Sequence, residues 1–181
     1  MAKKISKIDL VKSILADSFI DPAQDKLIED KSCDKVNPFV MKRNIVSHHD
    51  IDEHILYRFD PDKVDIFPFF KNRTTDLKKI CDYILFVEQG KSLFILLIEM
   101  KLGNISSRKQ LDASEMFINY ILESANRVNH KISDYHIRKI RICEHKSKGK
   151  RNTKPKDLEY DQNYYLDYNA IKDFRIKELL F

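Results

Sequence analysis

The chain has little of what marks a secreted, membrane-spanning or disordered protein. Its 181 residues include no tryptophan, three glycines and three cysteines, Cys33, Cys81 and Cys143, with no C-x-x-C spacing. An odd number of scattered cysteines argues against a disulfide framework and favours a reducing cytoplasm. The longest purely apolar run, residues 93–98, is too short to span a bilayer, and no secretory signal is visible at the start. We therefore expect a cytoplasmic protein with no membrane association.

The composition is that of a globular protein, with 43% hydrophobic and 34% charged residues. This length supports one well-filled core rather than two independent ones. We expect one domain over residues 1–181, made of an N-terminal helical region (1–46), a motif-bearing core (47–145), a basic loop (146–156) and a C-terminal strand and helix (157–181).

Positive charge is concentrated in the basic loop, which reads "KSKGKRNTKPK" and includes Lys148, Lys150, Arg151 and Lys154 but no acid. The net charge of +5 is modest, so this clustering carries more weight than the total. Four tyrosines follow it at positions 160, 164, 165 and 168. Lysines and arginines beside tyrosines are typical of a nucleic-acid surface, whereas the alternative is a solvated loop followed by a packed strand.

Periodicity predicts an α/β domain. Helical spacing favours helices over residues 4–18 and 107–128, the second opening with a capping-box pattern at Ser107 and Gln110. A similar pattern at Ser47 and Asp50 favours another helix over 48–59. A mixed sheet of four or five strands flanked by helices is then expected, with strands over 63–70, 78–87, 92–101 and 134–145 and a short one near the C-terminus.

The most informative stretch is "KKICDYILFVEQGKSLFILLIEMKLG", residues 78–103. It reads as a hairpin turning at Gly90, apolar on both faces and therefore covered on both. With the turn centred on residues 89 and 90, Asp82 lies opposite Leu97 and shares one face with Glu99 and Lys101. Charged residues on such a hairpin must be paired or must lie where the cover ends.

Two neighbouring carboxylates repel each other unless a cation lies between them. Magnesium binds through one or two carboxylates together with water and substrate phosphate, which Asp82 and Glu99 can supply. Lys101, two residues beyond Glu99 on the same face, is placed to orient or activate a water or to stabilise charge on phosphorus. The combination favours metal-assisted hydrolysis of a phosphodiester.

At these residues the sequence resembles the PD-(D/E)xK nuclease superfamily. Its signature, an aspartate on one strand of a hairpin and acid-x-lysine on the next, is matched by Asp82 and by Glu99-Met100-Lys101. Cys81 stands in place of the motif proline, and Gln110 is followed four residues later by Ser114 rather than by the tyrosine that some members carry. The resemblance covers residues 51–145 in the order of its elements.

The resemblance implies a restriction-endonuclease-like fold and a nuclease that depends on Mg²⁺ or Mn²⁺. Asp82, Glu99 and the Met100 carbonyl would bind the metal, Lys101 would assist the attacking water, and Glu53 and Gln110 would add contacts. DNA is the expected substrate because most family members cut DNA. Double-strand cleavage would require a homodimer. A larger defence complex in a bacterium or phage is a further expectation.

Two other functions are compatible with the sequence. A binding module on a nuclease-like fold would need only the basic loop and the tyrosines, and a ribonuclease would use the same three motif residues. Arg108 and Lys109, beside Gln110 in the first turn of the long helix, could meet a phosphate in any of these cases.

The cluster "HHDIDEH", residues 48–54, contains several possible metal ligands but lacks the H-E-x-x-H pattern. It is interpreted as a polar helix start with at most Glu53 turned toward the site.

Overall fold

The computed structural model describes residues 5–35, 38–47, 49, 51–59, 65–71, 73–74, 76–103, 105–128, 130–144, 158–168 and 173–181. The basic loop at 146–156, with Lys148, Lys150, Arg151 and Lys154, lies outside these residues.

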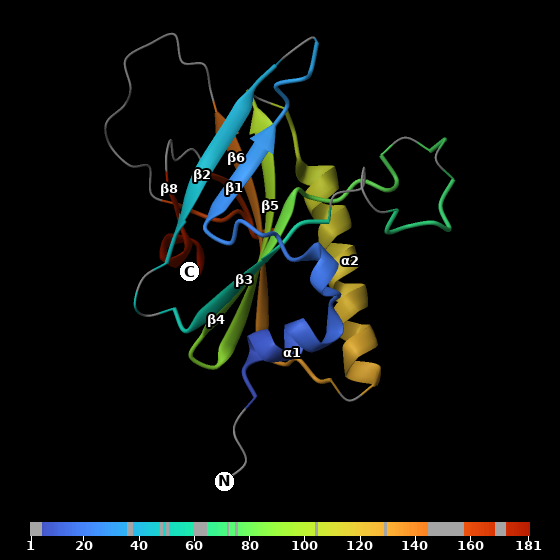
Figure 1. Ribbon diagram of the computed structural model, residues 1–181. Coiled ribbons are helices and arrows are strands. Elements are labelled where there is room, and N and C mark those ends of the chain that lie inside the picture. Colours follow the sequence, from blue (N-terminus) through green and yellow to red (C-terminus); the bar gives the residue numbers. More distant parts are fainter. Residues whose placement is uncertain are drawn as a thin grey trace.

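A five-stranded mixed sheet forms the centre of the molecule, in the order β3-β4-β5-β6-β7 (Figure 1). The strands β3 (Glu53–Tyr57), β4 (Tyr83–Gln89) and β5 (Ser92–Leu102) pair antiparallel, as hairpin neighbours do. The strands β6 (Tyr135–Glu144) and β7 (Tyr165–Tyr168) continue the sheet in parallel with β5. A mixed α/β fold with a five-stranded sheet is therefore confirmed.

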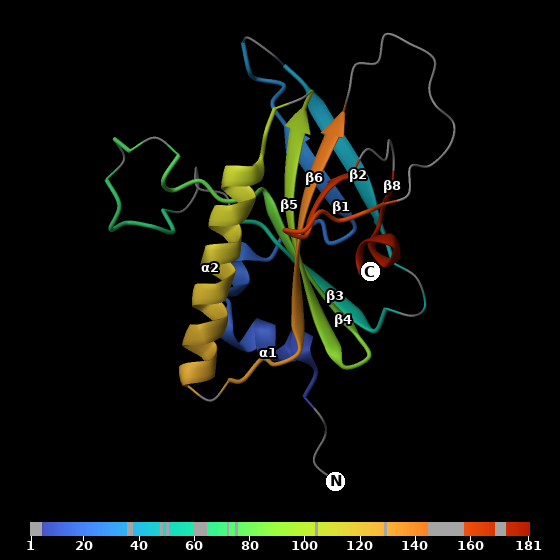
Figure 2. The same cartoon turned by 180° about the vertical axis from the view of Figure 1, so that it is seen from behind.

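The helices cover one face of this sheet. The helix α2 (Arg108–Arg127) connects β5 to the parallel β6, as a crossover between parallel strands requires (Figure 2). The shorter helix α1 (Lys7–Ile14) buries Ile8 and Val11, and its first backbone N–H groups donate to the Glu88 carboxylate of β4. A carboxylate at a helix N-terminus satisfies donors that have no partner within the helix. Among the described residues, no helix is long and apolar enough to cross a bilayer.

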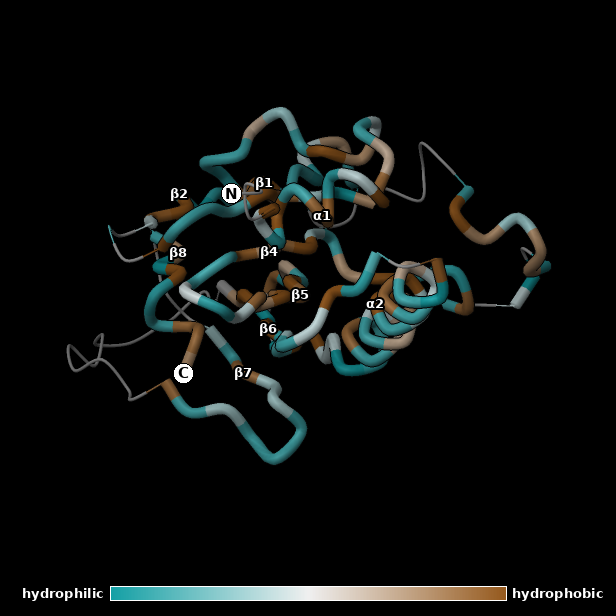
Figure 3. Tube along the Cα trace, turned by 90° about the horizontal axis from the view of Figure 1, so that it is seen from below, coloured by the Kyte–Doolittle hydropathy of each residue, from teal (hydrophilic) through white to brown (hydrophobic). Residues whose placement is uncertain are grey.

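A second sheet covers the opposite face. It consists of β1 (Lys26–Asp30), β2 (Val40–Val46) and the short β8 (Asp173–Arg175), followed by a 3₁₀ turn over Ile176–Leu179. The views along and across the strands show three layers: helices, the central sheet and this smaller sheet (Figures 1 and 3). A 3₁₀ turn over Asp17–Phe19 connects α1 to β1.

Two hydrophobic clusters fill the spaces between these layers. The β4–β5 hairpin supplies both, because alternate residues of a strand point to opposite faces. Tyr83, Leu85 and Leu96 pack toward the small sheet, while Ile84, Phe86 and Leu97 pack toward the helices. The prediction of a hairpin covered on both faces is confirmed.

The register of this hairpin differs from the predicted one by two residues. Gln89 pairs with Ser92, so the turn consists of Gly90, with φ +63°, and Lys91. Continuing this pairing past Tyr83 and Ile98 places Asp82 opposite Glu99 rather than opposite Leu97. A shift of two residues leaves every side chain on its predicted face.

Four predicted elements are wrong. The segment 48–59 contains the strand β3 instead of a helix, and the described residues 65–70 form no strand. Residues 19–46 carry β1 and β2 rather than continuing a helical region. At the C-terminus the closing helix is replaced by β8 and a 3₁₀ turn.

Candidate active site

The three motif residues converge where β4 begins beside β5. The backbone N–H of Asp82 donates to Oε2 of Glu99 at 3.1 Å, and the backbone N–H of Met100 donates to Oδ2 of Asp82 at 2.7 Å. Each carboxylate is thus held by the backbone of the other strand. Because β4 starts opposite Ile98, this contact forms at the end of the antiparallel ladder.

The charges at this point are buried. The side chain of Glu99 is 0% exposed, and its Oε1 forms an ion pair with Nζ of Lys101, which is 16% exposed. Burial, followed by the charges of Glu99 and Glu29, raises the pKa of Asp82 to about 8. Burial also raises the pKa of Glu99, against the opposing effect of Lys101. The charge of Glu99 therefore opposes the ionisation of Asp82.

A third acid, Glu29 of β1, belongs to the same electrostatic cluster. It is buried, and its carboxylate forms an ion pair with Nζ of Lys31 at 2.9 Å. The hydrogen bond to Glu29 is the main cause of a raised pKa at Lys31, with smaller contributions from the charges of Asp82 and Glu99. Sequence reasoning missed Glu29 because no local motif connects β1 to the hairpin.

The Tyr83 hydroxyl fixes β1 at the site. It donates to the carbonyl of Ile28 at 2.7 Å and accepts from the N–H of Ile28 at 3.0 Å. Since Tyr83 follows Asp82 and Ile28 precedes Glu29, this pair of bonds sets the position of Glu29 relative to the hairpin.

Removing this hydroxyl with Tyr83→Phe leaves both Ile28 backbone groups without their partner. We expect a loss of about 1–3 kcal/mol in the free energy of unfolding, measured by urea denaturation. Tyr168→Phe is the matched control, because the Tyr168 hydroxyl also joins two backbone groups, at Asp173 and Arg175, away from the site. A loss for Tyr168→Phe but none for Tyr83→Phe would contradict the anchoring role of Tyr83.

A serine in the first half of α2 holds the backbone next to Asp82 from the helix side of the sheet. The hydroxyl of Ser114 accepts from the backbone N–H of Cys81 at 2.7 Å and donates to the carbonyl of Gln110 at 2.7 Å. Ser114 stands where the resemblance would place a tyrosine, and it holds the residue next to Asp82. Gln110 lies on the first turn of α2, partly buried.

Glu53 does not belong to the site, which corrects the prediction. It pairs with Glu88 in the β3–β4 ladder, six residues along β4 from Asp82. At about 3.3 Å per residue, this separation is on the order of 20 Å. The Glu53 carboxylate instead forms an ion pair with Lys12 of α1 at 2.7 Å. The strand β3, in place of the predicted helix, thus puts Glu53 at the far end of β4 from Asp82.

Two residues at the start of α2 were predicted to contact phosphate; one of them is paired with protein groups and the other is exposed. Arg108 forms an ion pair with Asp161 at 2.8 Å, and its guanidinium lies 4.2 Å from the centre of the Tyr165 ring. Lys109 is exposed on the same turn. The predicted capping box is wrong, because the Ser107 side chain makes no capping hydrogen bond and instead lies near the Tyr165 hydroxyl at 3.4 Å.

The arrangement fits a magnesium or manganese ion bound by few protein groups. Among the described residues, no three His, Cys, Asp or Glu side chains converge into a metal-binding group, so a complete protein cage is not formed. Magnesium retains several waters and needs only one or two carboxylates, however. The buried Oε1 of Glu99 has no partner besides Lys101 within the described chain. In an extended strand the N–H and C=O of one residue point to the same side, so the Met100 carbonyl also faces Asp82.

Comparisons of the chain with protein-family models, curated proteins and solved structures found no match in any of the three. The assignment of a function therefore depends on the chemistry of Asp82, Glu99 and Lys101.

Proposed function

We propose that the protein is a metal-dependent nuclease whose active site consists of Asp82, Glu99 and Lys101. The observation that carries this proposal is the meeting of the buried Glu99 and the partly buried Asp82 at one strand junction, with the Lys101 ammonium as the partner of Glu99. A buried carboxyl whose pKa is raised to about 8 is unfavourable for stability alone and is typical of a functional site.

The protein groups at the site have separate proposed roles. Asp82, Glu99 and the Met100 carbonyl would hold the metal through oxygen atoms, the donors that Mg²⁺ and Mn²⁺ prefer. The ion would supply Lewis acidity toward the phosphate and lower the pKa of a bound water. Lys101, as an ammonium, donates hydrogen bonds that orient the water or stabilise negative charge on the phosphate. The water oxygen bonds to phosphorus, one P–O ester bond breaks, and the departing oxygen takes a proton.

DNA is the proposed substrate, with cleavage inside the strand. This part of the proposal depends on the resemblance to the PD-(D/E)xK nucleases, as do the homodimer and the role in prokaryotic or phage defence.

A nucleic-acid binding module is the second candidate, favoured by one observation. The Arg138 guanidinium lies 5.3 Å from the Tyr160 ring centre and 4.7 Å from that of Tyr164, and Tyr164 is 57% exposed. Such an arrangement could stack on unpaired bases whether or not the protein cuts them.

Incubation of closed circular DNA and a structured RNA with Mg²⁺, Mn²⁺ or EDTA tests the proposal. We expect the circle to be nicked or linearised with either metal and to stay intact in EDTA. Preferential cutting of RNA would reassign the substrate, and binding of both nucleic acids without metal-dependent cutting of either would favour the binding module.

A further inference from the structure

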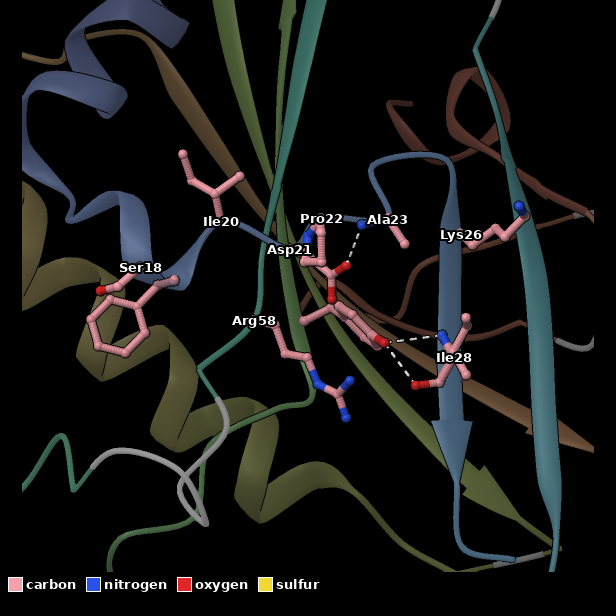
Figure 4. A pocket seen from close by; sticks show the side chains of 10 residues that line it. Ser18, Ile20, Asp21, Pro22, Ala23, Lys26, Ile28 and Arg58 are labelled. Atoms are coloured by element: carbon pink, nitrogen blue, oxygen red, sulfur yellow. Dashed lines mark hydrogen bonds between the residues drawn. The ribbon is translucent and has the colours of Figure 1, made fainter.

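A pocket of about 380 Å³ lies beside β1 (Figure 4). It lies between the segment 18–26, the strand β1 and Arg58, which follows β3. Tyr83 and Ile28 form part of its wall, and these residues are the chain neighbours of Asp82 and Glu29. Consecutive Cα atoms are about 3.8 Å apart, so the backbone of this wall is close to that of both acids. The volume of the pocket lies within the range of about 300–1,000 Å³ that is typical of small-ligand sites.

The lining favours an anionic ligand with an apolar, planar part. Arg58 and Lys26 contribute two cations and Asp21 one acid, while Phe19, Ile20 and Pro22 supply apolar surface. Asp21 is buried, and its Oδ1 accepts from the backbone N–H of Ala23 at 2.7 Å. This bond and the neighbouring Gln24 side chain, which joins Asp21 to Leu56, shape the pocket wall without a ligand.

Arg58 is the cation best placed to bind the ligand. Its guanidinium lies 5.4 Å from the centre of the Tyr83 ring, and it has no carboxylate partner among the described residues. A guanidinium over an aromatic ring is held in place while its N–H edge remains free to bind a phosphate through two hydrogen bonds. Lys26, in contrast, is at the rim and pairs with Asp25 at 3.4 Å.

The same residues connect the pocket to the proposed catalytic residues. Tyr83 points to the opposite face of β4 from Asp82, and its hydroxyl holds Ile28, the chain neighbour of Glu29, through two hydrogen bonds. A strand bound at Asp82 and Glu99 would have to pass the start of β4 to place a nucleotide at Arg58.

We propose that this pocket holds one unpaired nucleotide of the strand that is cut, with a phosphate on Arg58 and the sugar or base against Phe19. This inference rests on the proposed nuclease function and specifies how its substrate is bound. It assigns to Arg58 a role in binding rather than in the chemical step. Substrates with single-stranded or frayed segments should be preferred over fully paired DNA.

The test measures binding in EDTA of a fluorescent single-stranded DNA of about ten nucleotides, a length typical of such sites. We expect Arg58→Gln to weaken binding by about tenfold to a hundredfold, the effect of losing a charged hydrogen bond to phosphate. Arg58→Lys should restore part of the affinity. Arg127→Gln, at the exposed end of α2, is the matched control for loss of one positive charge and should bind like the wild type. Thermal unfolding of each variant checks that it is folded.

Equal binding by the Arg58→Gln and Arg127→Gln variants would overturn the inference. Thymidine monophosphate serves as the second probe: if it competes as strongly as the unlabelled oligonucleotide, the pocket binds a free nucleotide and the assignment to the cut strand is wrong. If Arg58→Gln weakens binding but the wild type cuts nothing, the nuclease proposal is wrong and the pocket remains a nucleotide-binding site. If cutting requires Lys101 while Arg58→Gln binds and cuts like the wild type, only the pocket assignment fails.

Discussion

Lys101→Ala is expected to lower the rate of metal-dependent DNA cleavage by about a hundredfold to a thousandfold, the usual effect of removing one preorganised charge that acts on the transition state. The loss should appear in kcat more than in KM, because Lys101 is paired with buried Glu99 and contributes little to binding the rest of the strand. The measurement is the rate of nicking of closed circular DNA at saturating Mg²⁺.

Two further variants make this result interpretable. Lys101→Arg retains the ion pair with Glu99 and checks that lost activity does not reflect unfolding. Glu53→Gln removes a carboxylate that lies about six residues along β4 from the site and pairs with Lys12 at the surface. It should cut at the wild-type rate, with a stability change of roughly 0–1 kcal/mol. Unchanged cleavage by Lys101→Ala, or an equal loss for Glu53→Gln, would refute the assigned site.

Asp82→Asn is expected to stabilise the metal-free protein at alkaline pH. The pKa of Asp82 is about 8 in the folded protein, whereas the unfolded chain has a value of about 4. Between these values the folded protein binds the extra proton, so the free energy of unfolding falls as pH rises, by at most about 1.4 kcal/mol per pH unit for one group. An asparagine still accepts from the Met100 N–H but cannot ionise.

The corresponding measurement is urea denaturation in EDTA at several pH values between about 3 and 9, a window that spans both values of the Asp82 pKa. Wild type should lose stability through this window, and Asp82→Asn should lose less. Addition of Mg²⁺ at the upper end should restore stability to the wild type and leave the variant unchanged, since ligands that bind only the folded state stabilise it. Parallel pH profiles in EDTA would contradict the raised pKa.

The hairpin was predictable because its residues are apolar on both faces and its turn contains Gly90. These features fix which residues share a face, so Asp82, Glu99 and Lys101 could be grouped before the structure was known. The register could not be fixed in this way, since a run of similar apolar residues tolerates a shift of two with no change of face.

The second sheet was not predictable because its inward positions carry charge. Glu29 and Arg43 are both buried on the side of β1 and β2 that faces the core, which interrupts the alternation of apolar and polar residues. In β3 the reverse applies: Ile55, Leu56 and Tyr57 are all buried, so no alternation is visible, and the polar residues before them resembled a helix cap. Both failures reflect tertiary packing, which a local pattern does not record.

The role of Glu29 had only a weak signal in the sequence, an acid two residues after the fully buried Leu27. Its proximity to Asp82 results from the bonds between Tyr83 and Ile28, which join segments 55 residues apart. The resemblance offered Glu53 as a further acid of the site. That prediction was wrong because its segment forms a strand that pairs with the far end of β4.

The most direct test of the central claim is a calorimetric titration of the protein with Mn²⁺ at a pH of about 8, near the pKa of Asp82. The account predicts one saturable site in the wild type and in Glu53→Gln, with protons released on binding, and no such site in Asp82→Asn. The same heat of binding in all three proteins, or none in the wild type, would contradict a metal centre at Asp82 and Glu99.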